Sequence, residues 1–166
     1  MTKKLITVFL SLIIFLNLFS CEKAAPSAKE LLCELCDGLR LPAGEVCFMG
    51  ACEGEDGYLS EDTARIIYGD SFISDTLPKL SDFALYLSSF PAPYEAAVFI
   101  CHSKSDTDSL LALCLERKDT LSVLLRGTDY ASLPQNARIF AKGRCVAMIL
   151  SDDPELAEKL LRKALS

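Results

Sequence analysis

The sequence has a single histidine, His102, and none of the short motifs that mark common catalytic sites. It contains no G-x-S-x-G, P-loop, dinucleotide-binding fingerprint or H-E-x-x-H. A Ser-His-Asp or Cys-His arrangement would have to use His102, which ends a predicted strand, where a surface or capping histidine is the simpler interpretation. Paired carboxylates such as Asp152 and Asp153 fall in predicted loops and helix caps, where a helix N-terminus accounts for them. The sequence therefore does not require an enzyme and favours a protein without catalytic activity.

Basic residues are in the minority, with 17 Lys and Arg against 23 Asp and Glu. Because phosphate binding needs a basic surface, no nucleic acid is expected as a partner. Charges of like sign form no long runs, which is typical of a solvated surface rather than an acidic tail. The acidic stretch 53–62 lacks the alternating Asp and Asn ligands and the closing Glu of an EF-hand, so we expect no calcium there.

No apolar run is long enough for a membrane-spanning helix. The longest, residues 5–19, has 15 residues, whereas a bilayer needs about 20. Lys3 and Lys4 precede this run and Leu18-Phe19-Ser20-Cys21 closes it, which is typical of a bacterial lipoprotein signal peptide ending in a lipobox. We therefore predict that residues 1–20 are removed and that Cys21 receives diacylglycerol, with a further acyl chain such as palmitate on its amine. Ordinary secretion after cleavage within 24–28 is the alternative.

The mature chain would consist of the lipidated cysteine and a short tether, residues 21–27, followed by a single α+β domain over residues 28–166. Loss of Lys3 and Lys4 leaves 15 basic against 23 acidic residues, a net charge of -8. The predicted location is the extracytoplasmic face of the cell membrane, with the lipid anchor as the membrane contact.

The hydrophobic pattern predicts two units of strand, strand and helix after an N-terminal helix. Ser27 and Glu30 form a capping box at the start of a helix over residues 27–39, and Ser60 caps a short helix ending at Gly69. Residues 41–62 read as loop with one short strand at 45–49. The two units comprise strands 82–88 and 95–102 with a helix over 105–126, and strands 137–142 and 145–150 with a helix capped by Asp153.

These units favour a four-stranded, mainly antiparallel sheet with their two helices on one face, and the repeated order suggests a weak internal duplication. Strands such as 96–101 are apolar on both faces. The other face would then be covered by the helix over 27–39, or by a partner.

Several loose motifs in this order resemble an uncharacterised family of small Gram-positive bacterial lipoproteins, catalogued as a domain of unknown function. The motifs are Ile67-Tyr68-Gly69-Asp70, residues 82–88, residues 95–99 and Leu150-Ser151-Asp152-Asp153. The resemblance covers roughly residues 41–165 and implies the compartment and the fold, without a catalytic signature. The family usually has other residues at the positions of four cysteines, Cys33, Cys36, Cys47 and Cys52. The resemblance therefore does not predict a role for these cysteines.

Those four cysteines lie within 20 residues and are the strongest candidates for chemistry: Cys33, Cys36, Cys47 and Cys52. We call them the four-cysteine cluster. They could bind zinc, form one or two disulfides or have no role. A thioredoxin-like role is disfavoured because its CxxC follows a strand, whereas Cys33 lies inside a predicted helix.

Export places the cluster where thiols are not kept reduced. Since a bridge within one helix would be strained, we predict that Cys33 or Cys36 bonds to Cys47 or Cys52 and that no cofactor is needed. The remaining thiols, Cys101, Cys114 and Cys145, lie in apolar segments and are predicted to be inert core residues.

Together these patterns predict a lipid-anchored extracytoplasmic protein that binds a protein partner, a second copy of itself or a small ligand without catalysis. The alternative is a thiol-redox or zinc-binding protein that acts through the four-cysteine cluster.

Overall fold

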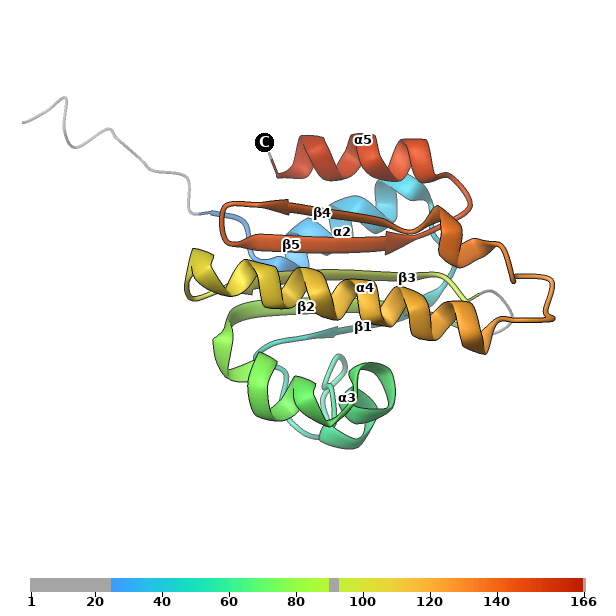
Figure 1. Ribbon diagram of the computed structural model, residues 1–166. Coiled ribbons are helices and arrows are strands. Elements are labelled where there is room, and N and C mark those ends of the chain that lie inside the picture. Colours follow the sequence, from blue (N-terminus) through green and yellow to red (C-terminus); the bar gives the residue numbers. More distant parts are fainter. Residues whose placement is uncertain (1–24, 90–92, 166) are drawn as a thin grey trace, which may run out of the picture.

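A five-stranded antiparallel sheet forms the centre of the computed structural model, which describes residues 25–89 and 93–165 (Figure 1). The strand order is β1-β2-β3-β5-β4, and every neighbouring pair is antiparallel. The strands are β1 (Gly44–Phe48), β2 (Leu80–Ser88), β3 (Glu95–Cys101), β4 (Arg138–Lys142) and β5 (Cys145–Leu150). β1 and β4 are therefore the two edges of the sheet.

Four α-helices accompany the strands within the described residues: α2 (Ala28–Leu39), α3 (Glu61–Tyr68), α4 (Thr107–Leu124) and α5 (Pro154–Ala164). Short helical turns connect them at Phe72–Thr76, Leu77–Lys79, Lys104–Asp106 and Leu133–Asn136. The predicted capping box is present, because the backbone N–H of Glu30 donates to Ser27 Oγ and the Ser27 N–H donates to Glu30 Oε2 at 2.8 Å. Ser60 caps α3 as predicted, and Asp153 caps α5.

Helices cover both faces of the sheet, so that the fold has three layers. α2 and α5 pack on one face over Val98 and Ile149, while α3 and α4 pack on the other over Phe99 and Met148. Figure 1 shows α4 in front of the strands and α2 behind them. Because successive strand residues point to opposite faces, the continuous apolar runs of β3 and β5 fill both cores, and all four of these side chains are fully buried.

The α+β class and the antiparallel sheet are confirmed, but the predicted number of four strands is wrong. The fifth strand is β1, which pairs with β2 from Gly44 opposite Ser88 to Phe48 opposite Ala84. The apolar pattern of β1 is short and is surrounded by glycine-rich sequence. This composition favoured a loop over residues 41–62, so β1 was not counted among the strands of the sheet.

The prediction that the helices of the two units share one face is also wrong. α4 crosses from β3 to β4 over one face, and α5 follows β5 onto the other, where it joins α2. The physical reason is that β3 and β5 are apolar on both sides. Burial of both sides requires a helix on each.

Candidate functional site

The predicted signal peptide, residues 1–20, and the predicted lipidation site, Cys21, lie outside the described residues. Over residues 25–89 and 93–165, no helix combines the length and the apolar composition that crossing a bilayer requires. The described part of the tether ends at Ser27, whose side chain caps α2. The anchor at Cys21 stays a prediction, because the described residues begin at residue 25.

The four-cysteine cluster is spread over three elements. Cys33 and Cys36 are on α2, Cys47 is on β1, and Cys52 is in the loop between β1 and α3. All seven cysteines of the described residues are free thiols. Cys36 packs against the core beneath α2 and α5, whereas Cys47 belongs to the core beneath α3 and α4, so the sheet separates them. The disulfide stays a prediction, and of the two possible partners for the α2 cysteines Cys52 is the exposed one.

The half-buried thiol of Cys36 and the buried thiol of Cys47 are poor nucleophiles. Burial raises the pKa of Cys36 to about 12, and the nearby Cys33 and Asp37 add to the effect. Burial, followed by the charge of Glu45, raises the pKa of Cys47 to about 11. The thiolate is the form that attacks disulfides and binds zinc, so both thiols are protonated near neutral pH. Among the described side chains, no three His, Cys, Asp or Glu residues are grouped to hold a metal ion.

The remaining thiols and the histidine occupy ordinary structural positions. Cys101 and Cys114 are buried, as predicted, while Cys145 is half-buried at the start of β5. Burial, with a smaller contribution from Glu95, raises the pKa of Cys114 to about 12. His102 is exposed just beyond β3.

A buried ion pair, which the sequence prediction missed, joins β3 to α4. Arg117 Nη2 lies 2.7 Å from Glu95 Oε2, and Arg117 Nε donates to both carboxylate oxygens at 3.1 Å. The side chains are 10% and 4% exposed, respectively. Arg117 Nη1 also donates to the backbone oxygen of Ile67 at 3.0 Å, which ties α4 to α3. The only feature of the sequence that could have indicated this ion pair was Glu95, a charged residue at the start of an apolar strand.

Tyr68 of α3 completes this network. Its hydroxyl donates to Glu95 at 3.5 Å, and its ring stacks on Phe72 with centroids 5.0 Å apart. Burial, followed by the charge of Glu95, raises the pKa of Tyr68 well above its ordinary value. A cavity of about 240 Å³ beside the network is lined by α3 and α4 residues, including Arg65 and Glu116. Arg65 is already engaged by Glu61, Asp62 and Asp70. The network therefore holds two helices to the sheet, and the charges of Arg117 and Glu95 are paired with each other.

The larger hollow is a groove of about 600 Å³ along the free edge of β1. Its lining combines strand residues, the tip of the following loop, one residue of α2 and one beyond β2: Lys29, Gly44, Glu45, Val46, Phe48, Glu55, Asp56, Gly57 and Ser89. Lys29 Nζ lies over the Phe48 ring, 3.6 Å from its centroid. Glu45, Glu55 and Asp56 are exposed, so carboxylates dominate the charge of the rim.

The hydrogen bonds of β1 show which backbone groups face this groove. Met49 N–H donates to Phe83 O and Ser89 N–H donates to Ala43 O. Because bonded and non-bonded pairs alternate along an antiparallel ladder, the odd-numbered residues of β1 bond to β2. The N–H and C=O groups of the even-numbered residues, Gly44, Val46 and Phe48, point away from β2 toward the groove.

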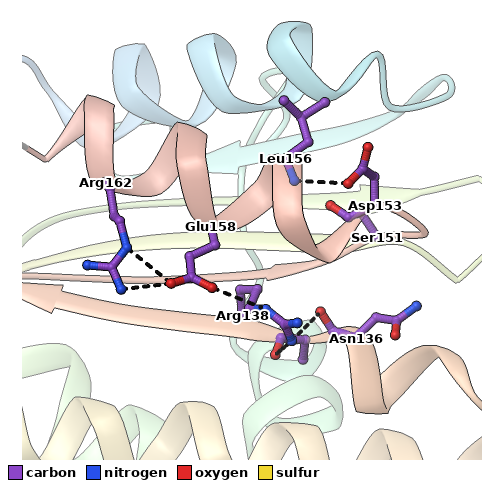
Figure 2. Close-up of polar contacts among 8 residues, drawn as sticks. Asn136, Arg138, Ser151, Asp153, Leu156, Glu158 and Arg162 are labelled. Carbon is purple, nitrogen blue, oxygen red and sulfur yellow. Dashed lines mark hydrogen bonds and ion pairs between the residues drawn. The ribbon is translucent and has the colours of Figure 1, made fainter.

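The opposite edge, β4, is tied to α5 by side chains. Figure 2 shows Glu158 of α5 between two arginines, with Oε1 accepting from Arg162 Nη2 at 2.7 Å and Oε2 lying 3.7 Å from Arg138 Nε of β4. Figure 2 also shows Asp153 Oδ1 accepting from the Leu156 N–H at 2.9 Å. The hydroxyl of Tyr94 donates to Asp152. The paired carboxylates that preceded α5 in the sequence are therefore a helix cap and a hydrogen-bond acceptor.

Comparison with known proteins adds no assignment. No family model, curated protein or solved structure matches this chain. The resemblance to Gram-positive lipoproteins therefore stays a prediction, and the groove along β1 is the candidate binding site on geometric grounds.

Proposed function

We propose that the chain is a lipid-anchored extracytoplasmic protein that binds a partner through the groove along β1 and catalyses no reaction. The observation that carries the binding role is the groove itself, which places outward-facing backbone groups beside an acidic rim. The anchored location is supported by the lipobox that ends at Cys21. An acyl anchor followed by the short tether would hold this groove close to the membrane surface.

Site-specific photo-crosslinking in intact cells tests this proposal. A photoreactive amino acid would replace Ser89, which is exposed and lines the groove, and in a control chain it would replace Lys159, which is exposed on α5. We expect a discrete cross-linked product from the Ser89 position in the membrane fraction and none from the Lys159 position. Recovery of the chain from the medium, or the same products from both positions, would contradict the proposal.

A thiol-redox or zinc role for the four-cysteine cluster is the rival proposal. The exposure of Cys33 and Cys52 supports it, since both thiols are open to reagents. The raised pKa of Cys36 and of Cys47 weighs against it, because each thiol would have to lose its proton to react or to bind zinc. Thiol counting on the native protein, with and without reductant and chelator, separates the two proposals.

A further inference from the structure

We propose that the groove along β1 binds an extended peptide segment with cationic side chains, which pairs with β1 as an added strand. This inference rests on the proposed binding role and names the chemistry of the partner. In such strand addition, main-chain hydrogen bonds supply affinity while alternate side chains supply specificity.

The backbone of β1 offers bonding positions for that strand. Gly44 and Val46 direct their N–H and C=O groups into the groove, because the bonds from Met49 and Ser89 fix the alternation of the ladder. Within the described residues, one outward-facing group of β1 has a backbone partner: the Phe48 N–H donates to Gly57 O at 2.9 Å. Unpaired edge groups of this kind are a template for another strand.

Gly57 closes the groove at the Phe48 end. Its φ is +89°, and a Cβ at this position would lie 2.3 Å from Phe48 Cε1 and 2.9 Å from Val46 O. Only glycine tolerates that backbone conformation and that approach. The loop is thereby held against the Phe48 N–H and the Val46 C=O, and the open part of the edge runs from the Val46 N–H to Gly44.

The charges around this edge select a cationic occupant. Glu45, Glu55 and Asp56 are exposed on the rim, while the ammonium group of Lys29 is held over the Phe48 ring. A second copy of the chain is a poorer occupant, because the mature chain carries a net charge of -8 and like charges repel. A peptide that alternates apolar and basic residues would place apolar side chains beside Val46 and basic ones on the face of Glu45.

The test uses the purified full-length chain in detergent and two fluorescent heptapeptides, the cationic TVKVKVT and its acidic counterpart TVEVEVT. Fluorescence anisotropy gives the affinity of each. Val46→Pro removes an outward N–H, and edge strands tolerate proline where the N–H faces away from the sheet. Ala141→Pro is the matched control on the other edge, since Lys142 pairs with Cys145 across the turn and the Ala141 N–H therefore points outward.

We expect the wild type and Ala141→Pro to bind the cationic peptide equally, and Val46→Pro to bind it at least about tenfold more weakly, as loss of one or more backbone bonds implies. The acidic peptide should bind the wild type at least about tenfold more weakly than the cationic one. If Val46→Pro loses its circular dichroism, the chain with both Glu45→Lys and Asp56→Lys replaces it, and its preference should shift toward the acidic peptide.

Equal binding by Val46→Pro and the wild type would overturn the proposal, and so would equal losses in the two proline variants. Concentration-dependent association of the wild type that Val46→Pro abolishes would identify a second copy as the occupant and would also overturn it. A cross-linked partner at Ser89 without binding of the cationic peptide would leave the proposed function standing and reject strand addition. Absence of that partner in cells would count against the proposed function itself.

Discussion

Replacement of Arg117 by methionine should destabilise the protein far more than replacement of a surface arginine. Arg117→Met removes the guanidinium from Glu95, whose side chain is 4% exposed, and from the backbone oxygen of Ile67. The carboxylate would remain buried without a cation, and Tyr68 would be its remaining donor. Breaking a buried pair in this way costs about 3 to 5 kcal/mol, a large share of the 5 to 15 kcal/mol that is typical of a domain.

Arg162→Met is the matched control. Arg162 and Glu158 also approach within 2.7 Å, but their side chains are 61% and 44% exposed. The two pairs share this distance, but the Arg117 pair is buried and Arg117 also bonds to Ile67 O, whereas Glu158 keeps Arg138 as a second cation. A solvated pair contributes little because water already stabilises both charges, so we expect a far smaller loss from the control.

Urea denaturation followed by circular dichroism gives the free energy of unfolding of each variant. Adding Glu95→Gln to Arg117→Met removes the uncompensated charge, and we expect this double variant to be more stable than Arg117→Met alone. A loss in Arg117→Met no larger than in Arg162→Met would refute the reasoning. A further loss on adding Glu95→Gln would refute it as well.

Three further predictions concern the anchor, the independence of the fold and the thiols. Labelled palmitate should enter the wild type and not Cys21→Ser; equal labelling of both would contradict the lipobox assignment. A chain shortened to begin at Ser27 should fold without metal, because both cores lie within the described residues; a random-coil circular dichroism spectrum under reducing conditions would oppose this. Mass spectrometry of protein purified under air should find a bridge between α2 and the loop after β1, whereas four free thiols in the cluster, or one zinc released per chain by a chelator, would reject it.

Local signals predicted the starts of α2 and α5 well. The capping box at Ser27 and Glu30 and the cap at Asp153 are short-range hydrogen bonds that the sequence spacing determines. The β4–β5 turn was predictable for the same reason, since Lys142 and Cys145 flank a two-residue connection that includes Gly143. Features of this kind depend on residues close together in the chain.

The arrangement of the layers depends on contacts that no local pattern contains. A two-fold repeat of the two strand-strand-helix units, with β3 and β5 antiparallel at its centre, would place both helices on the same face. The structure instead places α4 and α5 on opposite faces. The partner of Glu95 also lies 22 residues away, on α4, so its pairing with Arg117 could not be derived from the period of the strand.

The candidate groove was hidden for a related reason. An open edge exists only once the order of the strands is known, and β1 was predicted as a short strand within a loop, outside the sheet. The cysteines of the same region supported the alternative prediction of thiol or zinc chemistry, because the spacing of cysteines can be read from the sequence and the edge of a sheet cannot. Cys47 is instead 2% exposed and packs in the core beneath α3 and α4.

The most direct test of peptide binding at β1 is the amide hydrogen exchange of Val46, measured by NMR with and without the cationic heptapeptide TVKVKVT. The Val46 N–H faces the groove and should exchange more slowly when an added strand accepts its hydrogen bond. The amide of Ala141, on the opposite edge, should be unaffected. Unchanged exchange at Val46 at a saturating concentration of peptide, or equal slowing at Ala141, would contradict strand addition at this edge.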